Sequence, residues 1–373
     1  MNTGILLHYR GDNRDLLRHF GGTLNDTTKT TVAVIGGGMV SKTHLLAIAD
    51  LSDTLQLGGV YSRSLQSRNA LTAEAEAICG APCKVYDSID AICADETIDF
   101  AIVLTPPNAR MDITQKLAAA GKAILMEKPV ERTSEAAEQI VQTCEEAGVT
   151  LGIVFQHRVR AASEKLTDLI AHGSLGKLVL AEASVPWWRD QSYYDEPGRG
   201  TYARDGGGVL ISQAIHTMDL LLSLTGPVSE VMAMAHTTPL HQMESEDYVT
   251  ASLRFANGAA GSLMASTAHF PGDAESITLH FEKAVAHLQS GVLRLDWRDG
   301  RAEEFGETAT TGGGADPMAF THAWHQDIID DFAKTLQEDR DPLVTGRTAL
   351  EVHRLIEAIV TSSTEKRAIA LTS

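Results

Sequence analysis

The sequence predicts an α/β protein with two domains. The first is a doubly wound parallel sheet, and the second is an α+β domain with an open-faced, mainly antiparallel sheet. Short β-branched strands alternate with helices up to residue 155, and longer segments of alternating polarity follow them. A run of glycines also ends the first strand. We predict an extension at 1–28, the parallel-sheet domain at 29–155, the second domain at 156–345, and a closing helix and tail at 346–373.

The strands of the first domain are expected to be short apolar runs, as in a parallel sheet that is covered on both faces. They are predicted at Thr31–Ile35, Leu57–Tyr61, Phe100–Leu104, Ala123–Met126 and Thr150–Phe155. The segments between them show helical periodicity. They predict helices at Ser67–Cys79, 112–120 and 133–147, and another after the glycines.

In the second domain, alternating segments separated by turn residues predict an antiparallel sheet with one buried face. Strands are expected at Leu178–Val185, Val228–Ala235, Tyr248–Phe255, Gly258–Thr267, Ser276–Phe281 and Val292–Trp297. Helices are expected at Ala161–His172, Phe320–Glu338 and Gly346–Ser363, with a short one at Arg14–Phe20. The segment 301–317 is rich in Gly and Thr and is expected to be a mobile loop.

Composition argues against several classes of function. A formal net charge of −18 argues against nucleic acid or an anionic membrane as the main partner. The four cysteines lack a paired metal-binding pattern, so we expect no metal and a reducing compartment. The sequence has no secretory signal and no uninterrupted apolar run of about 18 residues. These features predict a cytoplasmic protein.

Glycines stand between the first strand and its helix in the pattern Gly36-x-Gly38-x-x-Ser41. Glycine allows a tight turn and the close approach of a pyrophosphate, and the helix N-terminus offers N–H groups and a positive dipole end. Because the motif has the strand before it and the helix after it that it requires, it predicts a dinucleotide site that includes Met39 and Val40. A tight turn with a purely structural role is the alternative.

The end of the second strand bears on the choice between NAD and NADP. An acidic residue there binds the ribose 2′-hydroxyl of NAD, whereas a nearby arginine accommodates the 2′-phosphate of NADP. This chain has Ser62 and Arg63 at that point and no acidic residue. The pattern favours NADP over NAD, and the alternative is that Arg63 is a solvated loop residue.

Two further segments carry candidate catalytic groups. Lys128 follows the fourth strand, at the sheet edge where ligands bind, although a surface lysine at a strand end is the alternative. His216 lies in a helix after Gly206–Gly208, with Ser212 and Asp219 expected on the same face. Oxidation of a carbinol needs a group that takes the hydroxyl proton, and histidine suits neutral pH. We predict that Lys128 and His216 are catalytic.

These motifs together resemble the family of glucose–fructose oxidoreductase, inositol 2-dehydrogenase and MocA, over nearly all of residues 31–365. The resemblance is carried by VIGGGMVSKTH, which ends at His44, and by TPPNA at 105–109, EKPV at 127–130 and GGGVLISQAIHTMDLL at 206–221. It implies a Rossmann domain followed by an open-faced sheet domain, with Lys128 as the catalytic lysine and His216 near the substrate carbinol. It also implies that the nicotinamide half of the cofactor is lined by Thr105, Pro106, Asn108, Glu127 and Lys128.

The chain departs from this family at two positions. Many members carry Asp four residues before the histidine, where this chain has Ser212, and Gln213 is a candidate to take part instead. Histidine often follows the TPP segment, where this chain has Arg110.

Aromatic residues are only 5% of the chain, yet they gather with arginines in the segment 187–204. Aromatic faces with polar neighbours suit a polyol, and Arg189, Arg199 and Arg204 are also suited to a carboxylate or phosphate. The residues predicted to bind substrate are Gln156, Arg158, Trp188, Arg189, Tyr202, Ser212 and Gln213. Packing at a subunit interface is the alternative for the aromatics. An open sheet face commonly needs a partner, so we expect a homodimer or homotetramer.

The sequence therefore predicts an NAD(P)-dependent oxidoreductase that transfers hydride to or from a carbinol carbon of a sugar, inositol, sugar acid or related molecule. One alternative is a redox-neutral glycosidase that uses NAD as a recycled oxidant. The other is a non-catalytic sensor of NAD(P) or sugar.

Overall fold

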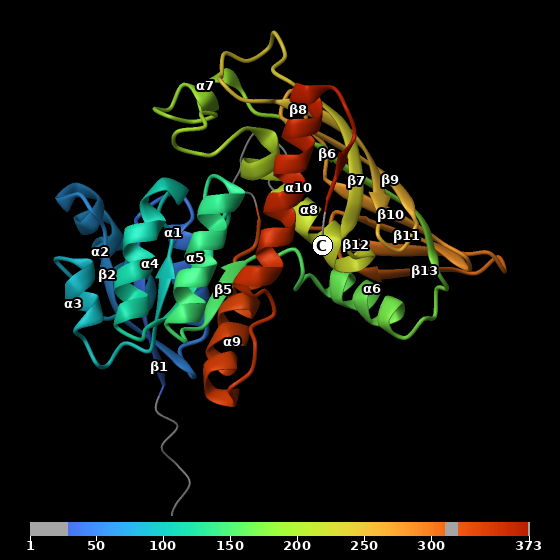
Figure 1. The fold of residues 1–373 in the computed structure, drawn as a ribbon. Helices are drawn as coiled ribbons and strands as arrows, with labels where there is room; N and C mark the ends of the chain where they lie inside the picture. The colour runs from blue at the N-terminus through green and yellow to red at the C-terminus, as the bar shows by residue number, and fades with distance from the viewer. Residues whose placement is uncertain (1–28, 310–319, 372–373) are drawn as a thin grey trace, which may run out of the picture.

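The computed structural model describes residues 29–309 and 320–371, which form two domains lying side by side (Figure 1). The helix predicted at Arg14–Phe20, the whole 1–28 extension and residues 310–317 of the predicted loop lie outside the described residues.

The first sheet has five parallel strands in the order β2-β1-β3-β4-β5, which confirms the predicted doubly wound sheet. The strands are β1 (Thr30–Ile35), β2 (Leu55–Tyr61), β3 (Phe100–Val103), β4 (Ala123–Glu127) and β5 (Leu151–Val154). Every residue of β1, β3, β4 and β5 is buried, which explains why these runs are apolar without alternation. The order reverses between β1 and β3, so a ligand crevice is expected where these two strands end.

Helices cover both faces of this sheet. On one face lie α1 (Ser41–Asp50), α2 (Leu65–Cys79) and α9 (Ala323–Glu338). On the other lie α3 (Ile89–Cys93), α4 (Arg110–Ala119) and α5 (Ser134–Glu146), with a 3-10 turn, η1 (Pro107–Ala109), before α4.

The position of α9 corrects the domain boundary that we predicted at residue 345. Phe332 of α9 packs against Phe100 of β3 with 5.2 Å between ring centroids, and a Cβ at Gly152 of β5 would lie 2.6 Å from the Phe332 ring. The chain therefore returns to the first domain after residue 320. Burial of the apolar face of α9 against a distant sheet is the physical reason.

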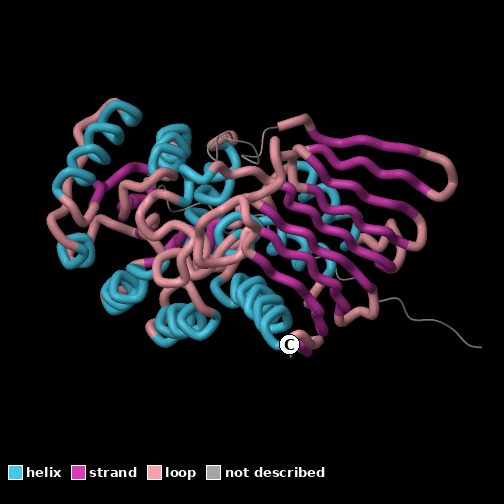
Figure 2. Tube along the Cα trace, turned by 90° about the horizontal axis from the view of Figure 1, so that it is seen from above, coloured by secondary structure: helices cyan, strands magenta, loops and turns pink. Residues whose placement is uncertain are grey.

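The second sheet has nine strands in the order β13-β12-β11-β10-β6-β9-β8-β7-β14, and Figure 2 shows them side by side. All neighbours are antiparallel except β6 and β9. The strands are β6 (Leu178–Pro186), β7 (Val228–His236), β8 (Tyr248–Phe255), β9 (Ala260–Ser266), β10 (Ser276–Phe281), β11 (Ala284–Gln289), β12 (Val292–Trp297), β13 (Ala302–Gly306) and β14 (Ile369–Ala370).

The strand β13 corrects the prediction of a mobile loop at 301–317. It pairs with β12 at the edge of the sheet, where backbone hydrogen bonds hold a charged sequence such as Glu303-Glu304 without burying it. The sequence analysis also missed β11, in which two of the buried positions are Ala284 and Ala286, a residue type of weak β propensity.

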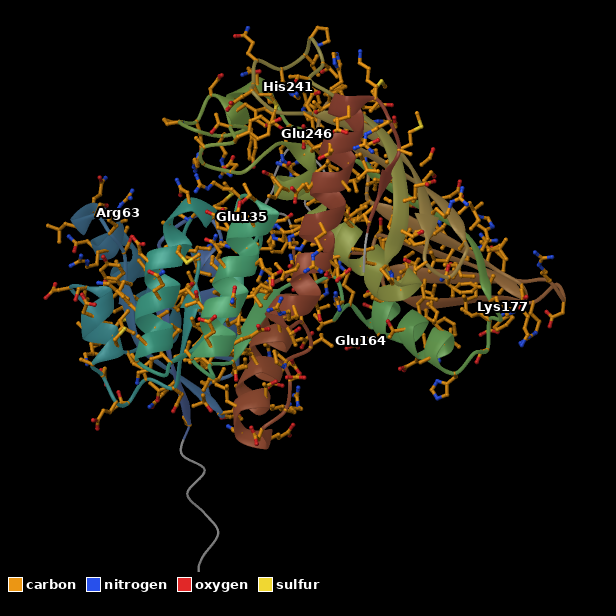
Figure 3. The ribbon with its side chains drawn as sticks, viewed as in Figure 1. Arg63, Glu135, Glu164, Lys177, His241 and Glu246 are labelled. Atoms are coloured by element: carbon orange, nitrogen blue, oxygen red, sulfur yellow. The ribbon has the colours of Figure 1, made fainter. Side chains whose placement is uncertain are left out.

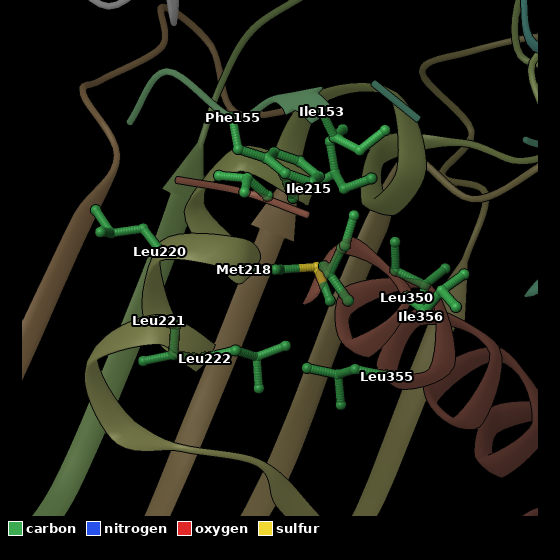
Figure 4. Close-up of a cluster of buried hydrophobic side chains, with 14 of the residues drawn as sticks. Ile153, Phe155, Ile215, Met218, Leu220, Leu221, Leu222, Leu350, Leu355 and Ile356 are labelled. Carbon is green, nitrogen blue, oxygen red and sulfur yellow. The ribbon is translucent and has the colours of Figure 1, made fainter. Parts of the chain in front are cut away.

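Helices pack on one face of the second sheet and join it to the first domain. They are α6 (Ala161–Ala171), α8 (Ile215–Thr225) and α10 (Gly346–Glu365), whereas α7 (Gln191–Tyr194) lies in the loop after β6. Figure 4 shows Ile215 and Met218 of α8 in one apolar cluster with Leu350 and Leu355 of α10. Among the helices described, none is long and apolar enough to cross a membrane.

Candidate active site

A cleft of about 320 Å³ lies where the carboxyl edge of the first sheet faces the second domain. The loops after β1, β3, β4 and β5 form one wall. The other wall is the loop that carries α7, which overhangs the first domain in Figure 1, together with the start of α8. The predicted site residues that line the cleft are Gly38, Met39, Val40, Thr105, Pro106, Glu127, Lys128, Gln156, Arg189, Ser212, Gln213 and His216.

The glycine turn after β1 is shaped for a pyrophosphate. Gly36 has φ +114°, and a Cβ there would lie 3.1 Å from the backbone of Leu104 and Thr105. Nothing among the described atoms lies within 4 Å of a Cβ at Gly38, so the turn is open on that side. No side chain caps the N-terminus of α1. An open turn before an uncapped helix end fits the phosphates of a dinucleotide.

The side chain of Lys128 extends from the first domain to the second. Its Nζ donates a hydrogen bond of 3.0 Å to the backbone carbonyl of Ser212. Burial lowers the pKa of Lys128 to about 8, and the nearby Arg110, Arg199 and Arg189 cations lower it too, whereas Glu127 opposes the shift. Lys128 is therefore an amine that can exchange a proton near neutral pH.

The segment before His216 is held by Glu246, whose position is labelled in Figure 3. The Glu246 carboxylate accepts hydrogen bonds of 3.2 Å from the backbone N–H groups of Gly208 and Leu210. A Cβ at Gly208 would lie 1.8 Å from the carbonyl oxygen of Glu246, so only glycine fits there. A π-helical turn, η2 (Leu210–Ala214), follows and leads into α8.

The structure brings only two of the three residues that we predicted on one polar face, Ser212, His216 and Asp219, to the cleft. Ser212 and His216 line the cleft, but Asp219 does not. The Asp219 carboxylate instead accepts hydrogen bonds of 2.7 and 2.6 Å from Arg158. The structure therefore pairs Arg158 with α8 and does not bring it into the cleft.

His216 is buried beside the cleft. Burial lowers the pKa of His216 well below its usual value, and the neighbouring Lys128 lowers it further, so the imidazole is neutral at neutral pH. Its ring stacks on that of His157, with 5.0 Å between centroids. Its Nδ1 has no hydrogen-bond partner among the described residues.

Glu127 anchors the backbone of Lys128. One carboxylate oxygen accepts a hydrogen bond of 2.8 Å from His44 and lies 3.6 Å from Nε2 of His325, while the other accepts from the Lys128 N–H at 3.1 Å. Burial raises the pKa of Glu127, but the bonds from His325 and His44 outweigh it and hold the pKa well below its usual value. Two histidines and a carboxylate form a donor set that metals also bind. In this structure, hydrogen bonds engage both oxygens of the Glu127 carboxylate.

Arg110, a departure from the family pattern, ties two loops of the cleft together. Its side chain is buried, and its Nε and Nη2 donate to the carbonyl of Thr105 at 2.9 and 2.8 Å. Its Nη1 donates to the carbonyls of Glu127 and Pro129. Because one guanidinium has five N–H groups, it reaches the loop after β3 and the loop after β4 at once.

The other predicted residues lie around the cleft without lining it. Ser62 is buried and Arg63 exposed at the end of β2, with Arg63 labelled at the upper edge of the first domain in Figure 3. Trp188 packs edge-on against Phe270 with 5.2 Å between centroids, and Tyr202 is exposed. Gly36 and Asn108 also lie outside the lining residues.

Several residues that sequence reasoning missed line the cleft. They are Pro107, Arg160, Asp205, Trp324 and His325. His157, which adjoins the predicted Gln156, and Tyr193 of the predicted segment 187–204 line it too. Trp324 and His325 come from α9 and reach the site only because this helix returns to the first domain.

Comparison with known families agrees with this architecture. Residues 30–155 match the model of the oxidoreductase family with an NAD-binding Rossmann fold, and residues 163–287 match the GFO/IDH/MocA C-terminal domain. The chain belongs to the GFO/IDH/MocA oxidoreductase family. The predicted family, fold and enzyme class are thereby confirmed.

Members of this family from bacteria resemble the chain over most of its length. Inositol 2-dehydrogenase of Rhizobium meliloti is 26% identical over 91% of this chain and 98% of its own. The scyllo-inositol 2-dehydrogenase (NADP(+)) IolW of Bacillus subtilis is 24% identical over 93% of this chain and 96% of its own. The solved WlbA dehydrogenase from Bordetella pertussis, in complex with NADH and UDP-GlcNAcA, has a TM-score of 0.77 and 29% identity, covering 92% of this chain and 99% of its own.

Replacing Arg110 by Met should weaken both folding and cofactor binding. Each buried carbonyl left without a donor costs about 1–3 kcal/mol, so we expect the free energy of unfolding to fall by about 2–4 kcal/mol. Urea unfolding and fluorescence titration with NADPH measure the two effects. Arg294→Met, at an exposed position of β12, is the matched control. Unchanged stability and affinity in Arg110→Met would contradict the linking role.

Proposed function

We propose that this oxidoreductase acts on a carbinol carbon of a sugar, inositol, sugar acid or related molecule, with Lys128 and His216 in proton transfer. The observation that carries the proposal is that both side chains line one cleft together with the glycine turn after β1. The names of the inositol dehydrogenases support the substrate class.

When bound, the nicotinamide cofactor accepts or donates the hydride. The open turn at Gly38 and the uncapped N-terminus of α1 would hold its phosphates. Thr105, Pro106 and Glu127 line the same cleft and are proposed to surround its nicotinamide half.

In the oxidation direction, the neutral amine of Lys128 takes the proton of the carbinol hydroxyl, and in reduction the ammonium returns it. The Ser212 carbonyl occupies one N–H of the amine and so orients it. His216, whose imidazole is neutral, hydrogen-bonds the carbinol and takes part in this proton transfer.

Lys128→Ala should abolish turnover and leave cofactor affinity mostly intact. In the wild type, oxidation should speed up as pH rises through about 8, because the neutral amine is the reactive form, and reduction should slow over the same range. The test begins with fluorescence titrations of NADH and NADPH, followed by initial rates on a panel of polyols and sugar acids.

Turnover on any member of the panel establishes the dehydrogenase. Tight cofactor binding without turnover on any of them would favour the redox-neutral glycosidase or the sensor. A normal rate in Lys128→Ala would refute its catalytic assignment.

For the cofactor, we propose a preference for NADP over NAD. Ser62 and Arg63 follow β2, with Arg68 close by: its Nε donates to the Ser62 carbonyl at 3.1 Å. Arg68 also donates to the Asp87 carboxylate at 3.0 Å, so Arg63, which is exposed, is the arginine that suits a 2′-phosphate. The name of the Bacillus subtilis relative also includes NADP(+).

Arg63→Ala should weaken NADPH binding by about tenfold or more, as expected for loss of a charge-assisted hydrogen bond. NADH affinity should stay nearly unchanged, because NADH has no 2′-phosphate. Both dissociation constants come from the same fluorescence titration. Equal weakening of the two cofactors would refute the role of Arg63.

We also propose a homodimer or homotetramer, formed through the face of the second sheet on which none of the described helices packs. Met232 and Met234 of β7 are exposed there, and a hollow of about 580 Å³ crosses strands β6 to β10. Exposed apolar surface of this kind commonly marks a protein interface.

For the location, we propose the cytoplasm. The four cysteines are free thiols, which supports this proposal because free thiols are typical of a reducing compartment.

The double substitution Met232→Glu with Met234→Glu should convert the oligomer to a monomer, because it places paired carboxylates in the interface. Sedimentation velocity measures the change. Lys177→Glu, at an exposed position before β6, is the control that alters charge away from this face. A wild-type protein that sediments as a monomer would contradict the proposal.

A further inference from the structure

The charge of the cleft is opposite to that of the whole chain. The protein has a formal net charge of −18. Among the described residues that line the cleft, however, six are Lys or Arg and only two are carboxylates, Glu127 and Asp205. The basic residues are Arg110, Lys128, Arg160, Arg189, Arg199 and Arg204.

Three of these cations are accounted for by other roles. Arg110 binds three backbone carbonyls, and Lys128 is assigned to proton transfer. Arg160 forms a buried ion pair of 2.7 Å with Glu275. Of the other three, Arg189 donates a hydrogen bond of 2.7 Å to the Trp188 carbonyl, and Arg204 lies 3.7 Å from the Asp205 carboxylate. Arg199 is the third, and all three lie on the loop between β6 and η2.

Arg199 is held in place with hydrogen-bonding capacity left over. Its guanidinium lies over the ring of Tyr193, 4.9 Å from the centroid. Its Nε is buried and has no hydrogen-bond partner among the described residues. The carboxylate of Glu196 lies 3.6 Å from it, but that side chain is 59% exposed. Tyr193 is itself fixed by a hydrogen bond of 3.3 Å from Gln213 of the π turn.

The loop that carries these arginines is anchored on the second domain. Arg204 donates to the carbonyl of Pro197 at 2.7 Å, which closes the end of the loop on itself. His241, labelled in Figure 3, bonds the Arg189 carbonyl at 2.8 Å with one ring nitrogen and the Asp247 carboxylate at 2.7 Å with the other. A loop fixed at both ends holds its cations in position before a ligand arrives.

The phosphates of the cofactor do not explain this cluster. The glycine turn and the N-terminus of α1 account for the pyrophosphate, and they belong to the opposite wall. Arginine only donates hydrogen bonds, and its planar fork matches a carboxylate or a phosphate. A neutral polyol would bring no negative charge to the unpartnered Nε of Arg199.

We propose that the substrate carries an anionic group, a carboxylate or a phosphate, that binds Arg199 beside Arg189 and Arg204 while its carbinol faces Lys128. This inference rests on the proposed function and specifies its substrate class.

The first test compares three compounds that share one ring: D-glucose, D-glucuronate and D-glucose 6-phosphate, with the matching galactose series. Dissociation constants are measured with the complex of protein and oxidised cofactor, so that the result does not depend on turnover. At least one anionic compound should bind about 10- to 100-fold more tightly than its neutral partner. This advantage should shrink as NaCl is raised from about 50 to 500 mM.

The arms of the test separate the two sources of negative charge. Tight binding of the uronates alone identifies a carboxylate, and tight binding of the phosphates alone identifies a phosphate. If no anionic compound binds more tightly than its neutral partner, the inference is overturned. Tight anion binding without hydride transfer would contradict the proposed function and leave this inference standing.

Substitutions assign the effect to Arg199. Arg199→Gln should remove most of the advantage of the anionic compound, with affinity for cofactor unchanged, and Arg199→Lys should restore part of it. Arg294→Gln is the control outside the cleft. If Arg199→Gln weakens binding of the neutral and anionic compounds equally, or leaves both affinities unchanged, Arg199 does not bind the anionic group and the assignment is wrong.

Discussion

The site depends on one contact between the domains, the hydrogen bond from Lys128 Nζ to the Ser212 carbonyl. A carbonyl holds the amine in place but carries no full charge, so it does little to offset the effect of burial on the pKa of Lys128. The backbone carbonyl is the same for any residue at 212, but an aspartate side chain there would add a carboxylate to the cleft, which would favour the ammonium and raise that pKa. Serine in place of the frequent aspartate is therefore consistent with an amine that loses its proton near neutral pH. Burial and the nearby Lys128 leave His216 neutral, although Glu127 opposes them.

Other features of the chain hold the two ends of this bond. On the second domain, Gly208 is pressed against the Glu246 backbone, and the Glu246 carboxylate caps the start of the π turn. On the first domain, Arg110 fixes the carbonyls on either side of Lys128, and Glu127 fixes its N–H. A histidine at position 110 has at most two N–H groups and could not bond three carbonyls. Arginine at this position thus has a physical explanation that the sequence did not reveal.

Features with a local signal could be predicted from the sequence, and features that depend on distant contacts could not. Buried runs such as Thr31–Ile35 and the alternating Tyr248–Phe255 gave strands at nearly the observed bounds, because burial sets their composition. Lys128, His216 and the glycine turn were found because their motifs are contiguous. The return of α9, which brings His325 to Glu127, arises from packing between residues about 200 positions apart. The π turn was missed because a residue pattern read at ordinary helical spacing contains no sign of an extra residue.

A protein of net negative charge can have a positively charged cleft, because solvent screens the distant surface carboxylates while the arginines lie at the cleft itself. At physiological ionic strength, charges more than about 8 Å apart in solvent interact weakly, so most of the surface carboxylates contribute little inside the cleft. Of the two carboxylates that line it, Glu127 is engaged by two histidines and by the backbone of Lys128. Asp205 accepts a hydrogen bond from the N–H of Gly200 in its own loop. The field that a ligand meets is therefore set by arginines on a fixed loop, and this field also contributes to the low pKa of Lys128. The arginines that would attract an anionic substrate therefore also lower the pKa of Lys128, the group that would take the proton of the substrate carbinol.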